Sequence, residues 1–400
     1  MSTSGQKPPP LPLDEAQARL LALAPLMRVE HRAAAECAGF YLAAPLRAKR
    51  TQPARPLSAM DGYAVRAADL PGPWQVTGES AAGRPHAGVL GPGEAARIST
   101  GAILPDGSDC VLIQEDCACE GAQLSLTTAP PVPADRHVRP RAMDFDAGAV
   151  LLEAGSLLGP AQIALAIAGG HGLLPVRAEP SVALLDSGDE LVAPGTETAV
   201  HQLPASNGPM LAAMLAAMPV TVSRAGPVGD DLDAIVAALD ARADADLIVT
   251  TGGASVGDHD LVRPALARIG AEIAFWRVAI KPGKPLMIAR RGHQLVLGLP
   301  GNPASAFVTG FLFMLPLVRA MLGASQPLPR SFPARLGAPL GAGGSRTEFI
   351  RARWDGQEVV PDAEQDSGAL APLARANVLV RREAGEPIRA RGESVPIYPL

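Results

Sequence analysis

The stretch "DLIVTTGG", residues 246–253, indicates the fold of its region more directly than any other part of the sequence. Its apolar residues run into two β-branched threonines and then into two glycines, which is typical of a buried strand that ends in a tight turn. After a further seven residues, "LVRPALARIG" (261–270) carries apolar residues at helical spacing. A buried strand, a turn and a helix in this order form the repeating unit of an α/β sheet.

The same unit recurs along residues 180–323. Ser206 or Asn207 is a candidate cap for one of the helices, and Asp230 or Asp231 for the next. This alternation predicts a mostly parallel sheet with helices on both faces, and ligands bind such sheets at the carboxyl ends of the strands. The expected elements are strand "SVALLDSG", helix "SNGPMLAAMLAAM", strand "VTVSRAGPV", helix "DLDAIVAALDARA", turn "KPGKPLMIA", strand "QLVLGLP" and helix "PASAFVTGFLFMLPLVRAML".

The regions on either side of residues 180–323 have a different sequence pattern. Short β-like runs separated by Gly, Pro and Asp fill residues 75–132, and a similar pattern follows Gln326. Each region is expected to form a small β domain. Helices are predicted over residues 13–28 and 160–170. The apolar window Leu157–Leu174 suits a buried helix better than a membrane span, because prolines, glycines and polar residues interrupt it.

Composition limits the class of protein. A chain of 400 residues with 48% apolar residues predicts several globular domains. The net charge of −5 argues against general binding to nucleic acid or to an anionic membrane. With four cysteines, no signal-like N-terminus and no transmembrane segment, a cytoplasmic location is expected.

Charged side chains gather where the predicted strands end. Carboxylates beside lysines in one crevice predict a site for a divalent hard cation and for an anionic, phosphorylated ligand. The acids are Asp186, Asp189, Glu190, Asp258 and Asp260, and the accompanying residues are Lys281, Lys284 and Ser305.

Each of these residues also has an ordinary structural interpretation. Taken alone, Asp258 or Asp260 is better explained as the cap of the helix that begins near Leu261. Asp189 and Glu190 are compatible with solvated loop acids. The phosphate-loop and dinucleotide-binding patterns are absent from the sequence, and Cys117 and Cys119 fit a hairpin better than a zinc site.

Seven motifs in order resemble the molybdopterin molybdenumtransferases, the family of the bacterial MoeA proteins and the E domain of gephyrin. The similarity spans nearly the whole chain. The motifs are "SAMDGYAV" (58–65), "RISTGAILPDGSDCVLIQED" (97–116), "SGDELV" (187–192), "TTGGASVGDHD" (250–260), "KPGKP" (281–285), "GLPGNPAS" (298–305) and "SGALAPLARANVLV" (367–380).

The resemblance implies a multi-domain α/β protein that forms an elongated homodimer. The expected parts are a connecting α+β domain (10–46 and 142–179), an inserted β domain (47–141), a three-layer α/β molybdopterin-binding domain (180–325) and a C-terminal β-barrel-like domain (326–400). In the family, the active cleft lies between the α/β domain of one subunit and the inserted domain of the other.

The resemblance also implies an activity. Such enzymes insert molybdate into adenylylated molybdopterin and release AMP in a Mg²⁺-dependent step of molybdenum cofactor biosynthesis. The upstream adenylyltransferase and the recipient molybdoenzymes are the expected protein partners, beside the small-molecule substrates.

Roles carry over residue by residue from the resemblance. Catalytic positions match Asp61, Thr100, Asp144, Glu190 and Asp260, with Glu190 and Asp260 as metal ligands. Binding of the substrates is expected from Gly252, Gly253, Ser255, Lys281, Lys284, Pro300, Asn302, Ser305, Arg346 and Ser367.

Two departures from the family pattern stand out. Ala142 and Met143 replace a usual Gly-Glu pair before Asp144, and Asp186 occupies a position where Ser or Thr is usual. These changes keep an alternative open, namely a non-catalytic molybdopterin-binding paralogue that stores or delivers the cofactor.

Overall fold

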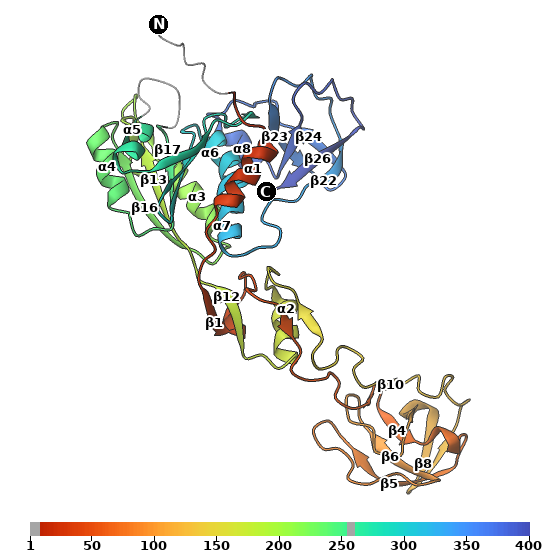
Figure 1. The fold of residues 1–400 in the computed structure, drawn as a ribbon. Helices are drawn as coiled ribbons and strands as arrows, with labels where there is room; N and C mark the ends of the chain where they lie inside the picture. Colours follow the sequence, from red (N-terminus) through yellow and green to blue (C-terminus); the bar gives the residue numbers. More distant parts are fainter. Residues whose placement is uncertain (1–8, 254–260) are drawn as a thin grey trace.

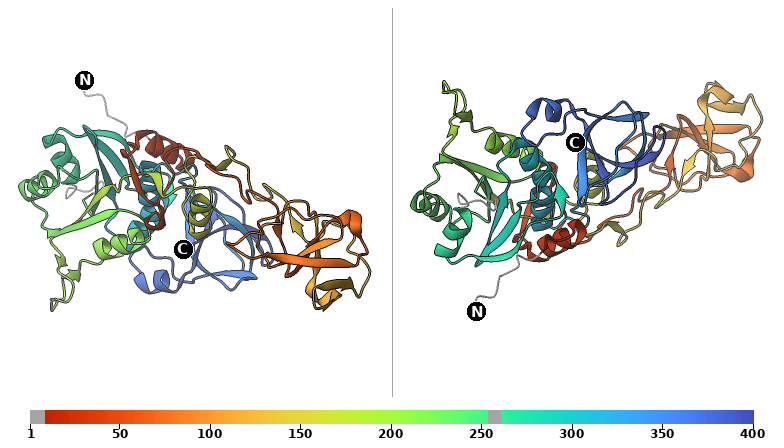
Figure 2. Two further views of the ribbon diagram at one scale, coloured as in Figure 1. Left: turned by 90° about the horizontal axis from the view of Figure 1, so that it is seen from below. Right: turned by 90° about the horizontal axis from the view of Figure 1, so that it is seen from above.

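The computed structural model describes residues 9–253 and 261–400, and these form an elongated molecule (Figures 1 and 2). The α/β unit and the C-terminal barrel form a wide body at one end. A narrow connector with β1, β12 and α2 leads from it to a separate β module at the far end. The domain boundaries drawn from the sequence remain predictions.

The central sheet of the body has the strand order β16-β13-β17-β21-β20-β18. The first four strands are parallel, whereas β20 and β18 extend the sheet as an antiparallel edge. The strand from "DLIVTTGG" lies near the centre with every residue buried, so a strand there and a mostly parallel sheet are confirmed. The bounds are β13 Ser181–Ser187, β16 Thr221–Val228, β17 Leu247–Thr251, β18 Glu272–Trp276, β20 Met287–Arg291 and β21 Gln294–Leu299.

One prediction about this region was wrong in part. "KPGKPLMIA" was expected to be a turn throughout, but Met287 and the residues after it form β20. Met287, Ile288 and Ala289 are fully buried, and burying these apolar side chains in the sheet stabilises a strand over a turn. The turn itself is confined to the segment between β19 (Ile280–Lys281) and Leu286.

Helices cover both faces of the sheet, which confirms the three layers. One core lies between the sheet and α1, α3, α6 and α7, and the other lies under α4 and α5. The run from α6 through a π-helical turn to α7, Pro303–Met321, is apolar and long enough to cross a membrane, but 83% of its most apolar window is buried inside the protein. The bounds are α1 Leu13–Leu23, α3 Asn207–Leu215, α4 Leu232–Asp240, α5 Val262–Arg268, α6 Pro303–Thr309, η4 Gly310–Met314 and α7 Leu315–Met321.

The structure decides between the proposed helix caps. Asp231 caps α4, where its carboxylate accepts a hydrogen bond from the Ala234 N–H at 2.8 Å. Ser206 precedes α3 without capping it, so the prediction for α3 was wrong. Asp186, at the end of β13, supplies the acceptor for this helix instead, because its Oδ2 lies 3.1 Å from the Gly208 N–H.

The connector is built from two short strand pairs and one helix around its own small core. Its helix forms where the sequence predicts it, but the expectation that this window is buried was wrong. Within α2 only Ala166 is buried, and Leu157, Ile167 and Leu173 are more than half exposed. The bounds are β1 Val29–Ala33, paired with β12 Leu173–Arg177; β2 Leu46–Arg47, paired with β11 Val150–Leu152; η1 Ala34–Glu36; and α2 Pro160–Ala168.

The far module is a six-stranded sheet in the order β7-β4-β6-β5-β9-β8, with an apolar cluster on each side. Cys117 and Cys119 lie on β8, in the β8–β9 hairpin as predicted. Burial raises the pKa of the Cys117 thiol to about 11. The bounds are β3 Leu57–Ser58, β4 Gly62–Val65, η2 Ala67–Asp69, β5 Trp74–Ser80, β6 Glu94–Ile98, β7 Cys110–Ile113, η3 Gln114–Asp116, β8 Cys117–Glu120, β9 Gln123–Leu126 and β10 Val138–Arg139.

The C-terminal strands close into a barrel. Each strand pairs with the next in the order β23-β24-β22-β26-β25, and β25 pairs with β23 to complete the circle. A two-residue parallel pairing between β19 and β23 joins this barrel to the α/β unit. The bounds are β22 Phe332–Leu336, β23 Thr347–Trp354, β24 Glu358–Pro361, α8 Leu370–Arg375, β25 Val378–Arg382 and β26 Ser394–Pro399. The minor pair is β14 Leu191–Val192 and β15 Leu203–Pro204.

Candidate active site

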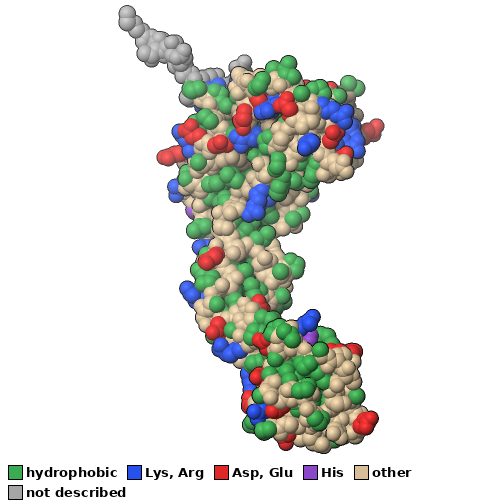
Figure 3. All heavy atoms as spheres, turned by 90° about the vertical axis from the view of Figure 1, so that its right-hand side faces the viewer, with side chains coloured by type: hydrophobic (Ala, Val, Ile, Leu, Met, Phe, Trp, Pro, Cys, Tyr) green, Lys and Arg blue, Asp and Glu red, His purple; other side chains and the backbone are tan. Residues whose placement is uncertain are grey.

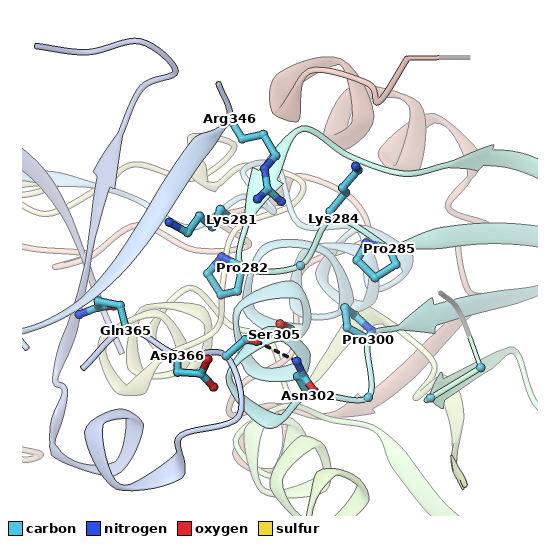
Figure 4. A pocket seen from close by; sticks show the side chains of 15 residues that line it. Lys281, Pro282, Lys284, Pro285, Pro300, Asn302, Ser305, Arg346, Gln365 and Asp366 are labelled. Carbon is cyan, nitrogen blue, oxygen red and sulfur yellow. Dashed lines mark hydrogen bonds between the residues drawn. The ribbon is translucent and has the colours of Figure 1, made fainter. Parts of the chain in front are cut away.

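A cavity of about 540 Å³ opens at the carboxyl ends of β17 and β21, between the α/β unit and the barrel (Figure 4). Its walls come from three chain segments of the α/β unit and from two loops of the barrel. The lining residues are Gly252, Gly253, Lys281, Pro282, Gly283, Lys284, Pro285, Pro300, Gly301, Asn302, Ser305, Arg346, Gln365, Asp366 and Ser367.

All the described residues that were predicted to bind the substrates line this one cavity. Ser255, the remaining one, lies outside the described residues. The rule that ligands bind at the carboxyl ends of parallel strands therefore led to a real cavity. That these residues contact a substrate remains a prediction.

The cavity exists because neighbouring strands end at the same level. Thr251 of β17 is level with Asp186 of β13 and with Leu299 of β21. Directly after Thr251 the chain turns at Gly252, with φ of +91°, and a Cβ atom at this position would lie 2.3 Å from the Ser187 carbonyl oxygen. Glycine is needed here for its conformation and for the close approach of the two strand ends.

The cations of the cavity differ in how far their charge is already balanced. Lys281 Nζ lies 3.2 Å from a carboxylate oxygen of Glu348, a buried residue of β23 that also pairs with Arg382. Burial alone would raise the pKa of Glu348, but hydrogen bonds from Arg382 and Lys281 hold it below its ordinary value. By contrast, no carboxylate within residues 9–253 and 261–400 lies within 4.0 Å of Lys284 Nζ or of the Arg346 guanidinium, so the charges of Lys284 and Arg346 are less neutralised than that of Lys281.

A buried arginine of the barrel shapes one wall of the cavity. Arg351 on β23 is only 2% exposed. Its guanidinium donates to the carbonyl oxygens of Ala369 and Asp366, each at 2.9 Å, and of Glu364 at 3.2 Å. These bonds fold residues 362–369 into a fixed loop, and burial lowers the pKa of Arg351.

The same loop is docked onto the start of α6. The Asn302 amide donates to Ser367 Oγ at 2.8 Å, and the Ala304 N–H donates to the Ser367 carbonyl at 3.0 Å. This contact places Gln365 and Asp366 at the cavity, although neither was predicted from the sequence. The only sequence signal was their position directly before the "SGALAP" motif.

The acids that follow β13 have separate roles. Asp186 accepts from Thr251 Oγ1 at 2.5 Å in addition to its bond with α3, and Asp189 accepts from the Asp230 N–H at 2.8 Å. Both are therefore structural acids. Glu190 is exposed, and its carboxylate folds back so that a Cβ on Gly188 would lie 2.5 Å from Glu190 Oε2.

Among the described residues, no three acidic, histidine or cysteine side chains are grouped suitably for a metal. Glu190 offers a hard carboxylate donor of the kind Mg²⁺ prefers, but it does not line the cavity. Asp258 and Asp260, the other candidates from the sequence, lie outside the described residues.

Two further predicted residues meet in the far module. The Thr100 N–H donates to Asp61 Oδ1 at 2.6 Å, and this hydrogen bond lowers the pKa of Asp61. Both side chains are exposed. Asp61 directly precedes β4 and Thr100 follows β6, at the opposite end of the molecule from β17 and α6 (Figure 1). One chain therefore does not bring Asp61 to the cavity.

Asp144 lies at the joint between the connector and the far module. Its side chain is exposed, while its N–H donates to the Gln52 carbonyl at 3.1 Å. Ala142, which replaces the usual glycine, adopts φ of +60°, in the left-handed region that favours glycine. The nearby Asp146 carboxylate is held by Thr51 and Arg141, which lowers its pKa.

Comparison with known proteins identifies relatives over the full length of the chain. Residues 11–170 match the model of the MoeA N-terminal region (domain I and II), residues 184–320 the probable molybdopterin binding domain, and residues 333–400 the MoeA C-terminal region (domain IV).

Individual proteins agree with these matches. The chain is 34% identical over 382 residues to a molybdopterin molybdenumtransferase of Nostoc sp., covering 90% of this chain and 86% of that protein. It is 30% identical over 405 residues to one of Staphylococcus aureus, with 98% and 96% covered. The crystal structure of a molybdopterin biosynthesis MoeA protein from Pyrococcus horikoshii superimposes with a TM-score of 0.84 at 25% identity, covering 98% of this chain and 100% of that one.

Proposed function

Because this chain belongs to the MoeA family and is a molybdopterin molybdenumtransferase of molybdenum cofactor biosynthesis, we propose that the cavity between the α/β unit and the barrel is where it inserts molybdate into adenylylated molybdopterin, with release of AMP. Molybdopterin and molybdate are the substrates that this activity implies. The non-catalytic carrier is the weaker alternative, because the departures at Ala142 and Asp186 leave the cavity lining intact.

The observation that carries the proposal is the set of donors in the cavity. Lys284, Lys281 and Arg346 present cationic groups to the same space, and Ser305 adds a hydroxyl from the first turn of α6. Oxyanions such as molybdate and the phosphates of the adenylyl group are bound best by charged donors held in a fixed geometry. Lys284 and Arg346 are the two cations whose charge no described acid balances, and Lys284 is the stronger candidate for the primary contact because Arg346 already donates to the Ile280 carbonyl.

The walls of the cavity contribute to rate by holding these groups in place before the substrates arrive. Glu348 fixes Lys281, the Ile280 carbonyl accepts from Arg346 at 3.1 Å, and the loop with Ser367 is locked to α6. Because these groups are already in position, little binding energy is lost to rearrangement of the site when the substrates bind. The cations neutralise the oxygens of the pyrophosphate linkage as AMP leaves.

We further propose that Mg²⁺ binds through Glu190 and Asp260 and, when bound, neutralises phosphate oxygens. Glu190 is the testable member of this pair because the structure leaves its carboxylate exposed. Glu190→Gln should raise the Mg²⁺ concentration needed for half-maximal AMP release roughly tenfold or more, since one charged ligand is lost. An unchanged Mg²⁺ requirement would remove Glu190 from the metal site.

The proposed active form is a cytoplasmic homodimer. Asp61 and Thr100 lie at one end of the chain and the cavity at the other, so a second copy is required to bring them together. The connector, the narrow waist in Figure 3, exposes apolar side chains of the kind that subunit interfaces cover. They are Leu26, Val29, Leu157, Ile167 and Leu173, each 47–60% exposed. The upstream adenylyltransferase and recipient molybdoenzymes remain the expected protein partners.

The direct test of the activity is release of AMP from adenylylated molybdopterin in the presence of molybdate and Mg²⁺. We expect turnover that depends on molybdate. Tight binding of the substrate without AMP release, even at saturating molybdate, would instead support the carrier alternative.

The shared site is tested with a mixed dimer in which one subunit carries Asp61→Asn and the other Lys284→Ala. Either homodimeric variant should be nearly inactive. In the purified mixed dimer one of the two sites is built only from unaltered residues, so about half of the wild-type activity should return. No recovery above the two homodimers would show that each chain works alone.

A further inference from the structure

Charge is distributed unevenly within the cavity. Arg346, Lys281 and Lys284 lie on one side of Pro282 in Figure 4, and Asp366 lies on the other side, close to Ser305 and Asn302. Among the described lining residues, Asp366 contributes the single carboxylate. An oxyanion is attracted to the cationic side and repelled from the acidic one, so the acidic side is suited to a different part of the ligand.

The Asp366 carboxylate accepts a hydrogen bond through only one of its two oxygens among the described residues. Its Oδ1 accepts from the Gly368 N–H at 2.8 Å. The backbone at Asp366 is fixed on both sides, since its N–H donates to Glu364 Oε1 at 2.6 Å and its carbonyl accepts from buried Arg351. No hydrogen-bond donor in the described part of the chain reaches Oδ2, so this oxygen remains available to a ligand.

We propose that Asp366 recognises the amino-pyrimidinone edge of the pterin, while the cations on the other side hold molybdate and phosphate oxygens. This inference rests on the proposed function. The pterin edge carries an amino group at C2 next to a ring N–H at N3, which are two parallel donors with no acceptor between them. A carboxylate is the side chain that accepts from both, and such charge-assisted paired bonds are strong and directional.

A purely structural role for Asp366 is the competing explanation, because Oδ1 already closes a turn with Gly368. The variant Asp366→Asn separates the two roles. Asparagine retains an oxygen that accepts from the Gly368 N–H, so the loop should persist. The second carboxylate oxygen becomes an NH₂ donor, which opposes the donors of the pterin edge.

The experiment measures binding of two fluorescent probes, 6-hydroxymethylpterin and 6-hydroxymethyllumazine, to the full-length protein. The lumazine has an oxygen in place of the 2-amino group. Wild type should bind the pterin roughly tenfold or more tightly than the lumazine, and Asp366→Asn should lose this preference. Asp362→Asn is the matched control, because Asp362 belongs to the same loop but does not line the cavity, and it should keep the wild-type preference.

The outcomes separate this inference from the function on which it rests. If wild type binds neither probe, or if Asp366→Asn keeps the preference for the pterin, Asp366 does not read the pterin edge. Molybdate-dependent AMP release by the same wild-type preparation tests the activity independently. Loss of the preference in Asp366→Asn, with the molybdate KM unchanged, supports recognition of the pterin by this residue rather than a general loss of structure.

Discussion

The cavity between the α/β unit and the barrel and the Asp61–Thr100 pair of the far module are both predicted functional sites, but they are built in opposite ways. The cavity gathers side chains from five segments and fixes them through buried Arg351 and Glu348. The Asp61–Thr100 pair is an exposed hydrogen bond between two surface residues. In the proposed homodimer, the cavity is preorganised within one subunit, whereas the pair is completed by the other subunit.

The largest effect should follow from replacing Arg351, the buried residue that fixes one wall of the cavity. Arg351→Ala removes the three hydrogen bonds that hold the carbonyl oxygens of Glu364, Asp366 and Ala369, which should cost about 3 kcal/mol of folding free energy. AMP release should fall at least a hundredfold, because the loop with Ser367 is no longer fixed. Chemical denaturation and kinetics on the folded fraction check both numbers.

Arg351→Lys sharpens the result. Lysine restores the charge but not the planar set of donors that reaches three carbonyls, so most of the loss should remain. Full rescue by lysine would mean that charge alone, and not the geometry of the guanidinium, organises this wall.

The next effect concerns the two lysines of the turn. Lys284→Ala should raise the molybdate KM roughly 10- to 100-fold, the loss expected for a charged hydrogen bond, with little change in stability. Lys281→Ala should raise it less, because part of the Lys281 charge is already balanced by Glu348. Molybdate titrations of both variants in parallel decide the order, and equal losses would show that the ion pair with Glu348 does not weaken the contribution of Lys281.

Acidic pH should weaken the ion pairs that Glu348 of the barrel makes with Lys281 at the cavity and with Arg382. The pKa of Glu348 is held below its ordinary value of 4.5, so its ionised form stabilises the fold above that value, and the contribution disappears as the pH falls through the lower, folded-state pKa. The variant Glu348→Gln should therefore be less stable than wild type at pH 7 by about 1–3 kcal/mol. The gap should narrow towards pH 3 in urea denaturation, while Glu197→Gln, altered at an exposed acid with no side-chain hydrogen bond or ion pair among the described residues, should follow wild type.

The smallest effect is expected at the base of the far module. Ala142 has φ of +60°, where a Cβ atom costs about 1–2 kcal/mol. Glycine removes this cost but is more flexible in the unfolded chain, so Ala142→Gly should stabilise the protein by about 0.5 kcal/mol. Ala149→Gly, at a nearby alanine without a positive φ, should be destabilising, and the same sign for both variants would rule out relief of backbone strain.

Local pattern accounts for the parts of the fold that sequence reasoning predicted. Three of the four parallel strands, β13, β17 and β21, are buried runs that end close to a glycine, and the α4 cap is a single Asp at the right place. The β18–β20 edge was missed because "KPGKP", which lies between the two strands, is dominated by turn residues. The closed barrel was expected only from the family resemblance, because its order depends on pairing between distant strands.

The residues of the candidate site also differ in whether a local sequence pattern predicts their position. Lys281, Lys284 and Ser305 follow predicted strands, so the position of the strand ends was enough to group them. Asp366 is placed by bonds to Arg351, 15 residues earlier and on another strand, and no local pattern encodes that contact. The proposed homodimer depends on a second chain, and the proposed metal site depends in part on Asp260, which lies outside the described ranges.

The far module leaves the connector and returns to it at almost the same point, because the Gln52 N–H donates to the Phe145 carbonyl at 2.9 Å. Its two ends are thus neighbours, and the segment between them has its own apolar clusters. A piece with adjacent ends can be cut out and replaced by a short linker without stretching the chain that remains. The molecule is in this respect two separable units: we expect that the body with its connector can be produced without the far module, and that the far module can be exchanged between relatives.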